Sequence, residues 1–206
     1  FLLAACANQA GEYLIEASEQ LSRRPLNDLV QALVSLGANI DGPNPGHFPL
    51  AVKGKKLAGG DIQISGKTSS QFVSALMLIS PYMQADLSLK VSELISKPYV
   101  TMTEKMMASF GVKVSDNVIA AGQCYQGCDY VVEPDLSSAS YFFAAAAVTG
   151  GQVKVKNIDR DNCLQGDIGF LTVLEEMGCH VEQLAGAVKV TGPMQLQGVT
   201  VDMGDI

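Results

Sequence analysis

The chain of 206 residues carries 21 acidic and 14 basic side chains, for a net charge of −7 at pH 7, and 48% of its residues are hydrophobic. The basic residues form no run that could follow a phosphate backbone, so nucleic acid is not an expected partner. No apolar run approaches the roughly 20 residues of a membrane-spanning helix, so we expect no membrane partner. Five cysteines without a C-x-x-C pair and only two histidines favour reduced thiols in a cytoplasmic protein and argue against a metal site.

The first third of the chain predicts a helix, a strand, a second helix and two more strands. Residues 1–7 (FLLAACA) resemble the end of a secretory signal, but they match residues 141–147 (YFFAAAA), and both stretches precede a glycine and an alternating strand. We therefore expect a helix there. The second helix should begin at Pro25 and end at Gly37, because proline suits the first helical position and glycine the left-handed residue after the last turn. Strands follow in HFPLAVKG and GGDIQISG.

The rest of the chain repeats this order twice. Residues 66–78 (GKTSSQFVSALML) and 134–147 (PDLSSASYFFAAAA) each place a serine pair before an apolar helix, and an alternating strand follows each helix. The next helices should end at Gly111 and Gly178, followed by strands in VIAAG, CDYVVEP, AVKVTG and GVTVDMG. The recurring order predicts an α/β fold made of βαβ units, each followed by a hairpin-like pair of strands.

The repeats also bear on the two ends of the chain. The turn that carries the serine pair is missing both before Phe1 and after Ile206. The chain therefore contains about three copies of the repeat, and it starts and stops at the same point of the repeat. We expect the chain to be a segment of a longer protein, in which Pro-Asp follows Ile206.

The serine pairs allow two interpretations. Ser69-Ser70 and Ser137-Ser138 can each cap a helix, since a serine oxygen accepts from the free N–H groups of the first turn, and Asp135 can cap the later helix as well. A helix start with two hydroxyl groups is also an oxyanion or phosphate site. The first pair is followed by Gln71, where the second pair has an alanine, so the first pair carries polar capacity that capping does not require.

Cations precede two of the predicted helices. Arg24 stands before Pro25, and Ser96-Lys97 stands before Pro98 in the stretch SKPY, which ends at Tyr99. A positive side chain at the positive end of a helix opposes the usual dipole preference. The arrangement makes physical sense if an anion binds between the two, but single exposed cations are also common on protein surfaces, and both interpretations remain open.

Several stretches together resemble a known family, the 5-enolpyruvylshikimate-3-phosphate (EPSP) synthases. They are, in order, RRPLNDLVQAL, SGKTSSQFVSALML, LISKPYVTMTEKMMASFGV, DLSSASYFFAAAAVTGGQVKV, QGDIGFLTVLEEMG and VDMGDI, and they span the chain from end to end. The resemblance implies an inside-out α/β barrel of the enolpyruvyl transferase type, with two domains that each contain three βαβαββ units. Residues 1–134 would belong to the first domain and residues 135–206 to the second.

The resemblance further implies a site for two anionic substrates. Shikimate 3-phosphate would be bound by Ser69, Ser70, Gln71, Ser96 and Tyr99. Phosphoenolpyruvate would be bound by Arg24 and Gln71, at the place for which glyphosate competes. No cofactor or metal is implied, and the full-length enzyme would be a monomer.

In the family reaction, the enolpyruvyl group moves to the 5-hydroxyl of shikimate 3-phosphate and phosphate is released. This chemistry needs a general acid/base pair and a cluster of cations around two polyanions. The resemblance places the catalytic acid and base outside this chain, so no catalytic residue is assigned within it. We expect the 206-residue polypeptide alone to be inactive.

Two other functions compete with this one. The first is the related transfer of enolpyruvate to UDP-N-acetylglucosamine, which uses a reactive loop cysteine; none of the five cysteines lies in a comparable cation-rich loop, and SKPY argues against it. The second is a non-catalytic repeat module that binds partners through its sheets. It predicts that Arg24→Ala and Ser69→Ala leave function intact and that no sugar phosphate binds.

Overall fold

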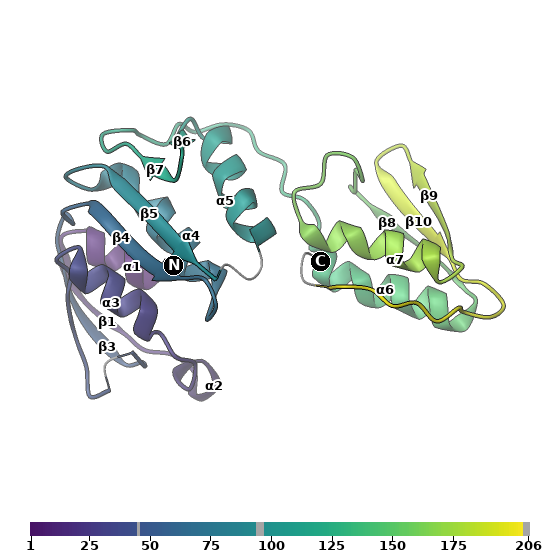
Figure 1. Ribbon diagram of the computed structural model, residues 1–206, viewed down its shortest axis with the longest axis horizontal. Coiled ribbons are helices and arrows are strands. Elements are labelled where there is room, and N and C mark those ends of the chain that lie inside the picture. Colours follow the sequence, from purple (N-terminus) through teal and green to yellow (C-terminus); the bar gives the residue numbers. More distant parts are fainter. Residues whose placement is uncertain (45, 94–96, 204–206) are drawn as a thin grey trace. The chain divides into compact units, whose positions relative to one another are not determined.

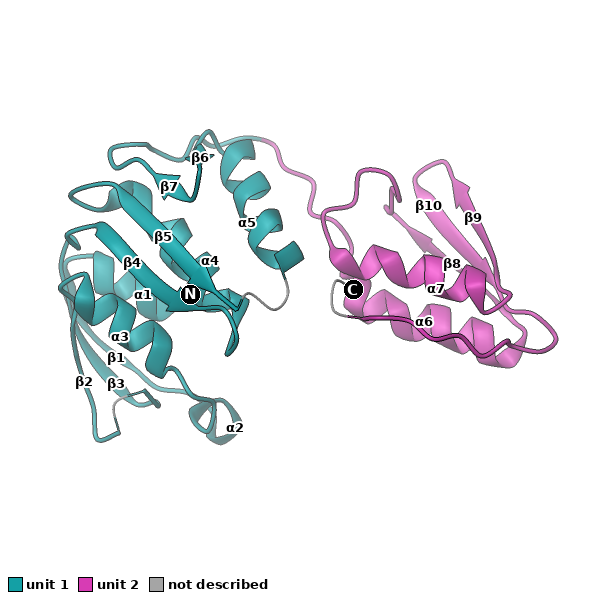
Figure 2. Cartoon of the chain, in the orientation of Figure 1, with its two compact units in different colours: residues 1–128 teal, residues 129–206 magenta. Residues whose placement is uncertain are grey.

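A computed structural model describes residues 1–44, 46–93 and 97–203 of the chain (Figure 1). The protein has a mixed α/β fold, as predicted from the sequence. It divides into two compact units, residues 1–128 and residues 129–206 (Figure 2).

The first half of unit 1 is a three-stranded sheet with helices packed against it. The sheet has the order β1-β3-β2, and β3 is antiparallel to both neighbours. Leu29 and Leu33 of α3, four residues apart on one helix face, are buried in the core of unit 1, as a 3.6-residue period requires. The elements are α1 (Leu2–Asn8), β1 (Gly11–Ile15), α2 (Glu19–Ser22), α3 (Asn27–Ser35), β2 (Asn39–Asp41) and β3 (Leu50–Gly54).

The second half of unit 1 contains a sheet of order β4-β5-β7-β6. Strands β4 and β5 are parallel and are connected by α4, the crossover that parallel neighbours require. Eight of the ten α4 residues from Ser70 to Ile79 are buried, and all of these except two serines are hydrophobic core residues. Helix α4 packs beside α1 and α5. The elements are β4 (Gly60–Ser65), α4 (Ser70–Ile79), η1 (Ser80–Tyr82), β5 (Leu87–Ser92), α5 (Lys97–Ser109), β6 (Val114–Ser115) and β7 (Val118–Ile119).

Unit 2 has its own three-stranded sheet and its own hydrophobic core. The sheet order is β8-β10-β9, with β10 antiparallel to both neighbours. Phe143 of α6 and Leu174 of α7 are buried in this core together with Val188 of β10. The elements are α6 (Leu136–Thr149), β8 (Gln152–Lys156), η2 (Gly166–Gly169), α7 (Phe170–Glu176), β9 (His180–Leu184) and β10 (Ala187–Thr191).

The same strand order recurs in all three sheets. In β1-β3-β2, β5-β7-β6 and β8-β10-β9, the third strand of the set lies between the first two and is antiparallel to both. The helix inside each set is followed by the predicted glycine, with φ values of 95°, 84° and 94° at Gly37, Gly111 and Gly178. These left-handed values confirm the predicted helix ends, because a side chain would be strained there.

Three predictions of the sequence analysis are wrong in detail. Helix α3 begins at Asn27, two residues after the predicted start at Pro25, although Pro98 does lie in the first turn of α5. The strands predicted in CDYVVEP and GVTVDMG are not formed within the described residues. A strand needs a partner for its N–H and C=O groups, and Val131 and Val132 are instead 86% and 75% exposed.

None of the described helices has both the length and the apolar character required to cross a membrane.

Candidate functional site

A cavity of about 310 Å³ lies at the beginning of α4. It brings together four of the residues predicted from the sequence, because its lining consists of Gly66, Lys67, Thr68, Ser69, Ser70, Gln71 and Tyr99. Arg24 is not part of the lining, and Ser96 lies outside the described residues. The serine pair and the aromatic ring, 30 residues apart in the chain, therefore share one site within unit 1.

The cavity lies where two parallel strands end. The Gly66 N–H donates to the Ser92 carbonyl at 2.8 Å, directly beyond the last paired residues of β4 and β5. The carboxyl ends of parallel strands are the usual place for ligands in α/β sheets, because the loops toward the following helices meet there. The loop 66–69 makes this connection from β4 to α4.

Ser69 is the N-cap of α4. Its backbone is extended, with φ −168°, and its hydroxyl oxygen accepts from the Gln71 N–H at 3.2 Å. The capping interpretation is thereby confirmed for Ser69. The cap uses the hydroxyl oxygen only as an acceptor, so the hydroxyl proton can still be donated to another group. Together with the positive end of the helix dipole and with Lys67, this arrangement suits a negatively charged ligand.

Tyr99 is positioned by contacts between α4 and α5. The Thr103 hydroxyl donates to the Tyr99 carbonyl at 2.9 Å, and the Thr103 and Ser74 hydroxyls lie 2.8 Å apart. Ser74 is one turn further along α4 than Ser70, so these bonds tie the first turn of α5 to the helix that begins at the cavity. The tyrosine is 41% exposed and forms the aromatic part of the cavity lining.

Arg24 lies in an exposed segment between α2 and α3. The first turn of α3, which follows that segment, is linked to the cavity loop by the Thr68 hydroxyl, which donates to a carboxylate oxygen of Asp28 at 2.6 Å. The sequence analysis missed both Thr68 and Asp28. A threonine in a loop and an aspartate in a first helical turn are ordinary by themselves, and no pattern connects two residues that are 40 positions apart.

The second serine pair is arranged differently from the first. Helix α6 is capped by Asp135, whose carboxylate accepts from the Ser138 N–H at 3.0 Å and from the Ser138 hydroxyl at 2.6 Å. The Ser137 hydroxyl donates to Asp167 at 2.7 Å. The interpretation of Ser137 and Ser138 as caps is therefore wrong, because the carboxylate two residues earlier offers the stronger acceptor. These bonds, first of all that from the Ser138 hydroxyl, lower the pKa of Asp135.

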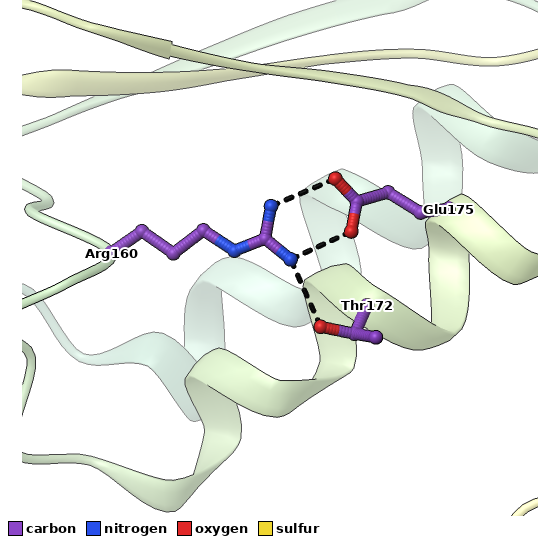
Figure 3. A network of polar contacts seen from close by, with 3 residues as sticks. All are labelled: Arg160, Thr172 and Glu175. Carbon is purple, nitrogen blue, oxygen red and sulfur yellow. Dashed lines mark hydrogen bonds and ion pairs between the residues drawn. The ribbon is translucent and has the colours of Figure 1, made fainter.

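A polar network around Arg160 is also internal to unit 2 (Figure 3). Its guanidinium donates to both Glu175 carboxylate oxygens, at 2.8 and 2.6 Å, and to the Thr172 hydroxyl at 2.9 Å. Hydrogen bonding with Arg160 lowers the pKa of Glu175, and the same bond raises the pKa of Arg160. With its donors engaged by α7, this arginine joins the loop after β8 to the helix and is not arranged to bind a ligand.

Two of the cysteines, Cys163 and Cys179, lie in surroundings that disfavour the thiolate. Burial raises the pKa of Cys163 to about 11, and its thiol lies 3.2 Å from a Glu133 carboxylate oxygen. Burial also raises the pKa of Cys179. A thiolate is the reactive form of cysteine, so these environments oppose the nucleophilic chemistry that a reactive loop cysteine would need.

Fold and site together define a mixed α/β protein with a polar cavity at a helix start, lined by a lysine, a threonine, two serines and a glutamine. The family model for EPSP synthase (3-phosphoshikimate 1-carboxyvinyltransferase) matches residues 1–206. The chain therefore belongs to the EPSP synthase family, and the family predicted from its sequence motifs is confirmed.

Curated relatives named 3-phosphoshikimate 1-carboxyvinyltransferase match the whole chain. The protein of Nostoc sp. (strain PCC 7120 / SAG 25.82 / UTEX 2576) is 45% identical over 214 residues, which cover 100% of this chain and 50% of that protein. The protein of Shewanella baltica (strain OS185) is 40% identical over 213 residues, with the same coverage of 100% and 50%. The chain spans about half the length of the curated relatives it matches.

Solved structures of EPSP synthase from Acinetobacter baumannii share the fold. One has a TM-score of 0.73 with 24% identity, covering 99% of this chain and 48% of that chain. A second has a TM-score of 0.71 with 25% identity, covering 96% and 47%.

Proposed function

We propose that the chain is part of an enzyme that transfers the enolpyruvyl group from phosphoenolpyruvate to the 5-hydroxyl of shikimate 3-phosphate, with release of phosphate. The observation that carries the proposal is the cavity at the start of α4, which gathers Ser69, Ser70, Gln71 and Tyr99. The names of the relatives, 3-phosphoshikimate 1-carboxyvinyltransferase, agree with that substrate pair.

The lining residues offer a complementary group for each part of shikimate 3-phosphate. The Ser69 proton, the Ser70 hydroxyl and Lys67 are donors for the phosphate oxygens, at the end of α4 where the dipole favours negative charge. The Gln71 amide can both donate to and accept from ring hydroxyls. The exposed ring of Tyr99 can pack against the face of the shikimate ring. Ser96, outside the described residues, is proposed as a further phosphate ligand.

In the reaction, the methylene carbon of phosphoenolpyruvate takes a proton and the 5-hydroxyl oxygen bonds to the neighbouring carbon, losing its own proton. The tetrahedral intermediate then loses phosphate and a proton from its new methyl group, which restores the C=C bond and gives the enol ether. Within this chain, Ser69, Ser70 and Tyr99 would hold shikimate 3-phosphate, the acceptor, and Arg24 with Gln71 would hold the carboxylate and phosphate of phosphoenolpyruvate. Holding both reactants in one orientation is a major part of catalysis for such a two-substrate transfer.

The same proposal extends to the architecture. The recurring strand order supports about three βαβαββ units of an inside-out α/β barrel, with residues 1–134 in one domain and residues 135–206 in the other. The complete enzyme is proposed to be a cytoplasmic monomer that needs no cofactor.

Calorimetric titration of the purified 206-residue chain with shikimate 3-phosphate tests the proposal. The double variant Ser69→Ala/Ser70→Ala should lower the affinity by roughly tenfold or more, because each hydrogen bond to a charged group contributes about 1.5–3 kcal/mol. The double variant Ser137→Ala/Ser138→Ala is the matched control and should bind like the wild type. Binding that is absent from the wild type, or equal in both double variants, would contradict the proposed site. Tighter binding of UDP-N-acetylglucosamine would favour the related transferase instead.

A further inference from the structure

Arg24 has two carboxylates close to it in the chain, and both are engaged elsewhere. Glu19 forms an ion pair with the neighbouring Arg23. Asp28, four residues after Arg24, accepts the hydroxyl proton of Thr68 at 2.6 Å. Within residues 1–44, 46–93 and 97–203, Arg24 takes part in no ion pair. The exposed guanidinium is thus available to a ligand although the surroundings are acidic.

Arg160, in contrast to Arg24, is paired with a nearby carboxylate. Its guanidinium engages both carboxylate oxygens of Glu175 and the Thr172 hydroxyl, so both terminal nitrogens already have partners within the chain. An arginine whose nearby carboxylate is not held by another donor readily forms such a two-pronged pair, because the fork of N–H groups matches a carboxylate. Asp28 is the carboxylate that could do this to Arg24, since four residues of chain are within the reach of an arginine side chain.

We propose that Thr68 holds the Asp28 carboxylate away from Arg24 and thereby keeps the guanidinium available for phosphoenolpyruvate. Thr68 also lines the cavity, so the residue that restrains Asp28 belongs to the loop that would bind the first substrate. Thr68 and Asp28 are thus positioning residues that act through Arg24. The inference rests on the proposed function and adds to it the reason why Arg24 has no ion-pair partner among the described residues.

The test is a phosphorus NMR titration of the 206-residue chain with phosphoenolpyruvate, in the presence of saturating shikimate 3-phosphate. Thr68→Val removes the hydroxyl at nearly constant volume and releases Asp28. The affinity for phosphoenolpyruvate should fall by about twofold to fivefold, the range of an exposed ion pair. Adding Asp28→Asn to this variant should restore the affinity, because the competing charge is gone. Thr68→Ser keeps the hydroxyl and should bind like the wild type.

The double variant separates this role from a purely structural one. If the hydrogen bond merely braces the loop, Thr68→Val/Asp28→Asn will bind as weakly as Thr68→Val, and the inference is overturned. It is also overturned if Thr68→Val binds phosphoenolpyruvate as the wild type does, or if the wild type binds shikimate 3-phosphate but no phosphoenolpyruvate. A wild-type chain that binds neither compound contradicts the proposed function itself.

Discussion

The serine pairs before α4 and α6 are nearly identical in sequence but differ in charge and in hydrogen bonding. Before α4 the cap is Ser69, a neutral residue that uses only its lone pair and has Lys67 beside it in the cavity. Before α6 the cap is Asp135, and the hydroxyl protons of Ser137 and Ser138 are donated to carboxylates. The first start can receive an anion, whereas the second already contains its own negative charges.

The difference indicates that, of two equivalent helix starts, only the one whose hydroxyl protons are not donated to carboxylates is suited to bind an anion. At both starts a side-chain cap accepts from a backbone N–H group of the first turn, which is the structural role of a cap. At α6, Asp135 and Asp167 use up the hydroxyl groups as well. At α4 the hydroxyl proton and the helix dipole remain for a ligand, so binding capacity depends on the single cap residue more than on the serine pair.

The contrast between the two helix starts is tested most directly by giving α4 a charged cap like the aspartate that caps α6. Ser69→Asp should keep the helix capped, since aspartate and serine cap about equally well. It should lower the affinity for shikimate 3-phosphate by at least about thirtyfold, because like charges a few Å apart at a protein surface repel by several kcal/mol. Calorimetry measures the affinity, and Ser69→Asn is the matched uncharged control. Equal affinities of the two variants would show that charge at this cap is unimportant.

The reciprocal change concerns stability and not binding. Asp135→Ala should loosen the first turn of α6, because it removes the acceptor of the Ser138 N–H and of the Ser138 hydroxyl. We expect faster hydrogen exchange of the α6 amides and an unfolding midpoint for unit 2 that is lower by about 4 °C or more. Asp135→Asn retains a capping oxygen and should change both quantities less. Affinity for shikimate 3-phosphate should not change, and a loss of binding would mean that the second helix start takes part in the site.

The contrast between Arg160 and Arg24 predicts a smaller effect on stability. Arg160→Ala should destabilise unit 2 by about 0.5–1 kcal/mol, since its pair with Glu175 is partly exposed and therefore screened. Arg24→Ala should leave the free energy of unfolding nearly unchanged, because its side chain has no ion-pair partner among the described residues. Urea unfolding of both variants measures this. A larger loss for Arg24→Ala would show that Arg24 has a structural role.

Features that depend on the local chain were predictable from the sequence. The Ser69 cap, the glycines after α3, α5 and α7, and the alternating strands all follow from the geometry of a few consecutive residues. Features that need a distant partner were not. The Asp28–Thr68 bond joins residues 40 apart, and the valines at 131 and 132 have strand character without a neighbouring strand. The periodicity of the sequence does not show that the starts of two helices lie side by side. Only the family resemblance implied that Tyr99 shares a site with the serine loop.

The smallest expected effect is the pH dependence of the α6 cap. The hydrogen bonds from Ser138 lower the pKa of Asp135 in the folded chain below its unfolded value. A carboxyl with a lowered pKa stabilises the fold fully above its unfolded pKa and loses that contribution as the pH falls through the folded pKa. Near neutral pH, protection of the α6 amides should therefore be constant, and it should decline only on strong acidification. Ser138→Ala removes the hydroxyl that is the main cause of the shift, so its decline should begin at a higher pH. Hydrogen exchange measured across the acid range distinguishes the two curves, and coincident curves would mean that the Ser138 hydroxyl does not stabilise the Asp135 carboxylate.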